Sequence, residues 1–165
     1  MQIRVDIDTR PIDKLLNDLH RQLAHLRPFY AEAAEILRRS VDKNFASGGR
    51  PRHWPVSGRV KRTGGETLVD TGRLRRSITT RVSDRHASVG TNVVYAAIHQ
   101  FGGRIGPHVI KPKRARALNI PGIGYRARVN HPGSTIPARP FLLVQDEDWQ
   151  AIRAAAIRHL LKGRR

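Results

Sequence analysis

Apolar residues recur at helical spacing near the start of the chain, and this pattern constrains the fold more strongly than any other feature of the sequence. The stripe consists of five residues at intervals of four and three, namely Ile12, Leu16, Leu19, Leu23 and Leu26. Residues at this spacing share one face of a helix. Asp8 and Thr9 are candidate N-caps and Pro11 suits a first helical turn, so we expect the helix to begin there. The apolar face predicts either core packing or, because its spacing is heptad-like, a seam against a neighbouring subunit.

Pro28 interrupts this stripe, and helical spacing resumes after it. The second set of apolar residues comprises Phe29, Ala33, Ile36, Leu37, Val41 and Phe45. Because proline disrupts a helix interior, we expect the helix to kink or restart at Pro28, which gives two helical pieces over residues 10–46. Upstream, the alternation of Ile3, Val5 and Ile7 with polar residues predicts a short strand.

The stretch from residue 47 to residue 66 is rich in Gly, Pro, Arg and Ser and has no periodic pattern. It predicts a long loop, in which Trp54 either anchors the loop to the body or serves in recognition. Farther on, apolar alternation on both sides of residues 83–86 predicts a β-hairpin. Val94, Ile98 and Phe101 then share a helical face, and Gly102 is placed to end that short helix.

Basic residues dominate residues 104–135, which hold two further candidate strands around a Pro-Gly turn. This segment predicts a second hairpin or an extended arm. Acidic residues at 146–148 favour a helix start, and an apolar face follows them, so we expect a C-terminal helix over residues 143–162. The sequence therefore predicts one α+β domain over residues 1–165, with helices from both ends packed on a small antiparallel sheet and a long basic loop or hairpin arm.

The chain is strongly cationic, with 31 Lys and Arg residues against 13 acidic ones and a formal net charge of +18. Such a charge favours a polyanion or an acidic protein surface as partner. Six clustered candidates for this contact are Lys111, Lys113, Arg114, Arg116, Arg126 and Arg128. They suit sequence-independent contact with the backbone of double-stranded DNA, or equally acidic patches on neighbouring subunits. No aromatic residue lies between Arg104 and Ala117, which disfavours stacking on single strands.

The residue inventory disfavours catalysis. There are no cysteines, and neither a phosphate-binding loop nor a serine-hydrolase elbow occurs. No two histidines have the spacing of helical zinc ligands, and Gly122-Ile123-Gly124 is interpreted as a turn. A nuclease or wall hydrolase would need a cluster of acids or a metal site that the sequence does not show. No apolar run approaches the roughly 20 residues of a membrane span.

Four stretches, in this order, carry a resemblance to a known family. They are residues 70–78 (DTGRLRRSI), 89–92 (VGTN), 95–103 (YAAIHQFGG) and 136–142 (IPARPFL). Together they resemble the phage virion morphogenesis family, which contains the tail completion proteins of Mu-like and related phages. The resemblance extends from about Phe29 to Leu142, with residues 104–135 as a longer basic insertion. Leu143 stands where the family pattern has a glycine.

The resemblance implies a structural virion protein, made in the host cytoplasm and added at the head–tail junction as a tail completion or neck protein, without a cofactor. It implies that the motif residues fix the fold and the subunit seam: Trp54, Asp70, Gly72, Leu74, Gly90, Tyr95, His99, Phe101, Gly102, Pro137, Arg139, Pro140 and Phe141.

We expect the chain to form a ring with copies of itself, a hexamer rather than a dodecamer. Its expected neighbours are connector, tail terminator or tail tube proteins, with genomic double-stranded DNA in the lumen. The alternative is a free, sequence-independent double-stranded DNA-binding protein.

Overall fold

The computed structural model describes residues 8–162, so the strand predicted from Ile3, Val5 and Ile7 lies outside the described residues. The helices in this part are α1 (Arg10–Ala24), α2 (Arg27–Ala46), α3 (Gly58–Thr63), α4 (Arg73–Arg76), α5 (Ala96–Phe101) and α6 (Asp146–Leu160). The strands are β1 (Thr79–Val82), β2 (Ala87–Gly90), β3 (Gly103–Ile105), β4 (His108–Ile110), β5 (Leu118–Ile120), β6 (Gly124–Arg126), β7 (Val129–His131) and β8 (Ser134–Ile136).

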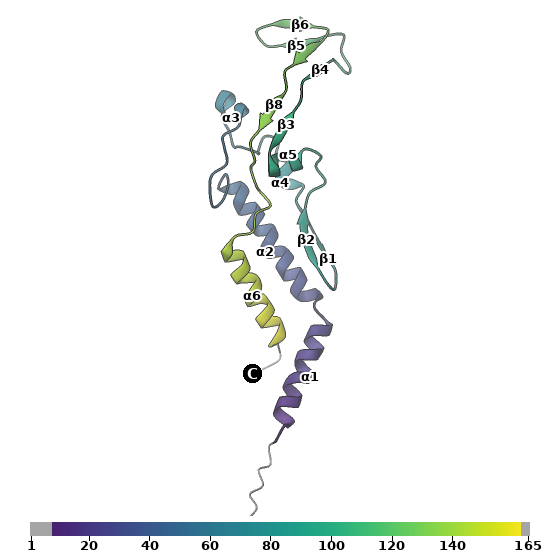
Figure 1. Ribbon diagram of the computed structural model, residues 1–165, viewed down its shortest axis with the longest axis vertical. Coiled ribbons are helices and arrows are strands. Elements are labelled where there is room, and N and C mark those ends of the chain that lie inside the picture. Colours follow the sequence, from purple (N-terminus) through teal and green to yellow (C-terminus); the bar gives the residue numbers. More distant parts are fainter. Residues whose placement is uncertain (1–7, 163–165) are drawn as a thin grey trace, which may run out of the picture.

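The molecule is elongated, with a small body between two projecting elements (Figure 1). In the body, α2 packs against α6 and against the β1–β2 hairpin. Helix α1 continues beyond one end of α2, and the strands β3 to β8 extend from the opposite end (Figure 1). The body therefore contains only part of the chain.

The predicted restart of the N-terminal helix is confirmed. The helix is interrupted at His25 and Leu26. Pro28 lies in the first turn of α2, where its missing N–H costs no helical hydrogen bond. No residue of α1 is buried, and Leu16 is 57% exposed. The apolar stripe of α1 is therefore not part of the core of this chain, and the core-packing interpretation of the stripe is wrong for α1.

The predicted first hairpin is also confirmed, with antiparallel pairing from Thr79 and Gly90 to Val82 and Ala87. The basic segment forms a hairpin arm in which β3 pairs with β8, β4 with β7 and β5 with β6. All residues of β3, β4 and β6 are exposed, so the arm projects from the body.

The α+β class is confirmed, with one difference in the sheet. The described strands form four separate two-stranded sheets, whereas we expected one small sheet. The reason is local: each pair belongs to one of two hairpins, and the second hairpin leaves the body.

The predicted loop over residues 47–66 contains a short helix, α3, that the sequence analysis did not predict. Its N-cap is Ser57, whose Oγ accepts a hydrogen bond from the Val60 N–H at 3.3 Å. Six residues are too few to show an apolar periodicity, so only the serine could have indicated this helix.

The core is small and is built around three aromatic rings. The Phe45 ring lies 5.6 Å from the Trp54 ring, edge to face, and 5.5 Å from the Phe141 ring. Trp54 therefore anchors the loop to the body, as one of our two alternatives predicted. The other buried members of the cluster are Val41, Leu74, Val93 and Ala96.

Buried polar side chains join α2 to α6 beside this core. The Ser40 hydroxyl donates to the Asp148 carboxylate, and that carboxylate also accepts the Gln145 N–H at 2.8 Å, which caps α6. The Arg50 guanidinium donates to the Ser40 carbonyl at 3.0 Å and to Glu147 at 2.6 Å. These bonds fix the start of α6 on α2.

Truncation of Phe141 is expected to cost much of the stability of the fold. Phe141 is 0% exposed, whereas Phe101 is 78% exposed. Phe141→Ala should lower the free energy of unfolding by about 3–5 kcal/mol, because it leaves a cavity in a small core. The control Phe101→Ala should change it by less than about 0.5 kcal/mol. Urea unfolding followed by circular dichroism measures both, and equal losses would contradict this description of the core.

Candidate functional site

Residues 137–142 connect the arm to α6 without forming a strand, and other parts of the chain hold their backbone. The Arg139 N–H donates to the His99 carbonyl at 2.7 Å. The Gln100 side-chain oxygen accepts the N–H groups of Phe141 and Leu142, each at 3.0 Å. The end of α5 thus positions this segment.

The same segment is held from the body side. The Trp54 indole N–H donates to the Pro140 carbonyl at 3.2 Å. The Asn44 side-chain amide, fully buried in α2, donates to the carbonyls of Phe141 at 2.9 Å and Leu143 at 3.1 Å. Since Pro137 and Pro140 have no N–H, these side-chain contacts replace the ladder hydrogen bonds of a strand.

Gly102 permits the close approach of two motif stretches, residues 95–103 and residues 136–142. Its φ is +72°, a conformation that favours glycine. A Cβ at this position would lie 2.8 Å from the Ala138 nitrogen and 3.0 Å from the Ile136 carbonyl oxygen. Stretches 95–103 and 136–142 therefore fit together only with glycine here.

The stretches 70–78 and 89–92 are joined in a similar way. Gly72 has a φ of +73° at the start of α4. This conformation turns the chain so that Leu74 lies in the core, where it is 3% exposed. The Ser77 and Thr91 hydroxyls are hydrogen-bonded at 2.6 Å. Gly90 ends β2 opposite Thr79, directly before this contact.

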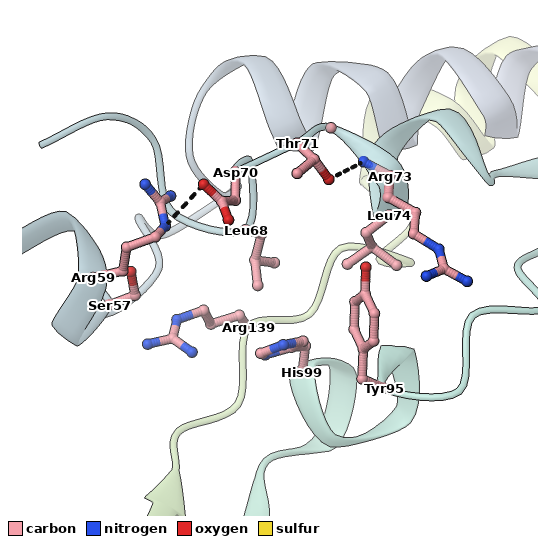
Figure 2. A pocket seen from close by; sticks show the side chains of 11 residues that line it. Ser57, Arg59, Leu68, Asp70, Thr71, Arg73, Leu74, Tyr95, His99 and Arg139 are labelled. Atoms are coloured by element: carbon pink, nitrogen blue, oxygen red, sulfur yellow. Dashed lines mark hydrogen bonds and ion pairs between the residues drawn. The ribbon is translucent and has the colours of Figure 1, made fainter. Parts of the chain in front are cut away.

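Three of the four motif stretches line one cavity of about 390 Å³ (Figure 2). Figure 2 shows His99 projecting from α5 and Tyr95 from the residue before it, with Arg139 beside His99. The lining residues are Ser57, Arg59, Leu68, Asp70, Thr71, Gly72, Arg73, Leu74, Tyr95, His99 and Arg139.

The cavity gathers six of the thirteen predicted motif residues: Asp70, Gly72, Leu74, Tyr95, His99 and Arg139. The others lie elsewhere. Trp54 and Phe141 are core residues, whereas Phe101 is exposed at the end of α5. Gly90 belongs to the β1–β2 hairpin. Gly102, Pro137 and Pro140 determine the backbone path of residues 137–142 beside the cavity. Val94, which we placed on the same helical face as Phe101, precedes α5 and is 97% exposed.

Arg139 and His99 give the cavity its electrostatic character. Arg139 is 5% exposed, and its Nε donates to the Pro55 carbonyl at 2.7 Å. Burial lowers the pKa of the Arg139 guanidinium. Burial, and after it the positive charge of Arg139, lowers the pKa of His99, so His99 is neutral near neutral pH. The His99 Nδ1 is buried and has no hydrogen-bond partner among residues 8–162.

The six predicted basic residues lie together in the outer half of the arm, around β4 to β7 and beyond β3 and β8 (Figure 1), and none of them lines the cavity. All six are exposed. Lys111, Lys113, Arg114 and Arg116 lie between β4 and β5, Arg126 ends β6, and Arg128 lies between β6 and β7. No acidic residue occurs between residues 104 and 135, so these charges are not neutralised within the arm.

The sequence analysis missed the contributions of Arg59, Arg73 and Asn44. Arg59 lies in α3 within a stretch without pattern, and its guanidinium binds the carbonyls of Gly64, Glu66 and Val69. Arg73 was inside a motif stretch but was not singled out. Asn44 is a polar residue next to Phe45 in an apolar helical pattern, and that position was the available signal for its buried role.

Within residues 8–162, no group of three His, Asp or Glu residues is arranged to hold a metal ion. The helices of the same part include none that is both long and apolar enough to cross a membrane.

Gly102→Ala is expected to destabilise the chain more than Gly122→Ala. Both glycines have a positive φ, so both substitutions carry a backbone cost of about 1–2 kcal/mol. A Cβ at Gly102 would clash with backbone atoms, whereas a Cβ at Gly122 would face open space. Thermal unfolding should therefore show a clearly larger fall in Tm for Gly102→Ala, and equal shifts would contradict the close approach of the two stretches.

Comparison with known proteins agrees with the resemblance of the motifs. The phage virion morphogenesis family matches the chain over residues 7–161. A protein of Haemophilus influenzae, "Mu-like prophage FluMu G protein 2", is 35% identical over 147 residues, which cover 88% of this chain and 87% of that protein. No solved structure shows a significant match. The chain belongs to the phage virion morphogenesis family and has a structural or morphogenetic role in a phage virion.

Proposed function

We propose that the chain is a tail completion or neck protein that forms a ring at the head–tail junction and joins the tail to the head. It acts by assembly and not by catalysis. The observation that carries the proposal is the projection of two exposed elements, α1 and the arm, from a small core (Figure 1). Membership of the family supports a place in the virion.

Helix α1 supplies the surface for contact between copies. Ile12, Leu16 and Leu23 are each more than half exposed on one side of this helix, and an exposed apolar stripe of this kind marks an interaction site. Its spacing suits helix-to-helix packing against a second copy. Repeated head-to-tail contacts of this type close into a ring.

We favour a hexameric ring, which matches the symmetry of a tail tube, over a dodecamer. Its neighbours in the proposal are connector, tail terminator or tail tube proteins, and genomic DNA passes through its lumen. The chain is made in the host cytoplasm and ends in the virion at the head–tail junction.

Polar substitution of the α1 stripe is expected to prevent ring formation without unfolding the chain. Leu16→Ser with Leu23→Ser removes exposed apolar surface that the core does not use. The oligomer should dissociate to monomers in light scattering after size exclusion, while the unfolding free energy of the monomer changes by less than about 1 kcal/mol. The control Val94→Ser, at a residue 97% exposed outside α1, should keep the oligomer. A ring that persists in the double variant would contradict the α1 seam.

A second candidate function, sequence-independent binding of double-stranded DNA, is favoured by the arm. Its basic residues are exposed, clustered and not neutralised by any acid of the arm. Lysine and arginine that neutralise phosphates release counterions and give affinity for any sequence. In the ring, the same arm would contact the genome; in the alternative, a free monomer would bind duplex DNA.

Charge removal from the arm should reduce the salt dependence of duplex binding. In Lys113→Gln, Arg114→Gln, Arg116→Gln, the slope of log K against log salt should become less steep by about 3, since each lost phosphate contact contributes about 0.9. The matched control neutralises three exposed arginines of the body, Arg52, Arg62 and Arg85. Fluorescence anisotropy with two unrelated duplexes measures the slope. An equal change in both triple variants would show that the arm is not the DNA contact.

A further inference from the structure

The cavity at the base of the arm contains a buried positive charge without a negative partner. Arg139 is 5% exposed, and the one hydrogen bond that its side chain makes within residues 8–162 goes to the neutral carbonyl of Pro55. A buried guanidinium without a carboxylate is unfavourable, because desolvation is not offset by an opposite charge. This arrangement is stabilised when an anion enters from outside the chain.

The remaining charges of the cavity have the same sign. Three arginines, Arg59, Arg73 and Arg139, line it together with one carboxylate, Asp70, so positive charge is in excess. Asp70 lies 3.7 Å from Arg59 and is 73% exposed, so it faces outward. It therefore does not neutralise Arg139.

The rest of the cavity lining is suited to contact with the aliphatic part of a ligand whose charged group is an anion. Leu68, Leu74 and the ring of Tyr95 form part of the wall (Figure 2), and the Tyr95 ring packs edge to face on His99 at 5.8 Å. The volume, about 390 Å³, is that of a small binding pocket. The ligand chemistry is thus a compact anion on an aliphatic chain.

We propose that this cavity receives the carboxylate of a glutamate or aspartate side chain from an acidic segment of another virion protein. Arg139 would bind the carboxylate, since a guanidinium matches its planar geometry. Arg73 lies on the other side of Tyr95 and His99 (Figure 2), so it adds positive charge at the cavity without contacting the same carboxylate. The His99 Nδ1, buried and without a hydrogen-bond partner in residues 8–162, is a further polar group beside Arg139. The negative charge of Asp70 in the lining repels a chain of several phosphates more strongly than a single carboxylate.

A second copy of this chain is disfavoured by its own charge, although Asp13, Glu66 and Asp146 are exposed and stand outside the ion pairs of residues 8–162. Eight of its acidic residues are already in ion pairs, namely Asp8, Asp18, Glu32, Glu35, Asp42, Asp70, Asp84 and Glu147. Asp148 is buried. With a net charge of +18 per copy, an acidic partner is the favoured one. This inference deepens the proposed function, because it gives the chemistry of a neighbouring protein.

The test is a nuclear magnetic resonance titration of the purified full-length chain with a short peptide, acetyl-Gly-Leu-Glu-Leu-Gly-amide, and with its Gln counterpart. The Glu peptide should shift the signals of Tyr95, His99 and Arg73 in a saturable way, and the Gln peptide should not. Arg73 is exposed and lies outside the core, so Arg73→Gln should fold normally and, by removing one positive charge from the cavity, weaken binding about threefold. Arg139→Lys should weaken it as well, because it loses the planar fork.

The matched control is Arg85→Gln, an exposed arginine of the β1–β2 turn that does not line the cavity, and its affinity should stay unchanged. Equal shifts with both peptides, shifts confined to the arm, or no saturable shift at millimolar peptide would overturn the proposal. Saturable binding of inorganic phosphate in place of the Glu peptide would also overturn it and favour nucleic acid. Because the isolated chain is used, failure here leaves the proposed place in the virion untouched.

Discussion

The structure depends on the hydrogen bonds that hold residues 137–142 in an extended conformation without a partner strand. Trp54, Asn44, His99 and Gln100 supply these bonds from three different parts of the chain. Because two of the six residues are prolines, a regular ladder cannot form here. The segment places Phe141 in the core and Arg139 at the cavity, and it fixes the end of the arm beside α5. Loss of these bonds would release the segment that follows β8 from the body, whereas β3 would still be joined to α5.

Local features of the fold could be predicted from the sequence. Periodicity identified α1, α2, α6 and the first hairpin, since each has enough residues to show its pattern. The short helix α3 has too few residues for such a signal. The exposed position of the α1 stripe could not be derived either, because an amphipathic pattern is the same whether the apolar face meets its own core or another chain.

The candidate site was predictable as a set of residues but not as a cavity. Asp70, Tyr95, His99 and Arg139 stand in three stretches of the chain, and their convergence depends on contacts such as Arg139 N–H to the His99 carbonyl. The sequence does not indicate that the Arg139 side chain donates to a backbone carbonyl, that of Pro55, because this contact joins two distant parts of the chain. Arg59 was not foreseen, because its role consists of bonds to backbone carbonyls of a loop.

Taken with the family, these features describe a chain whose exposed surfaces are suited to assembly: an apolar helix at one end, a basic arm at the other and a cationic cavity between them. The most direct test is cryo-electron microscopy of purified virions with this chain traced into the density. We predict a closed ring at the head–tail junction, with α1 at the contact between subunits. Absence of the chain from the virion, or a location away from that junction, would contradict the account.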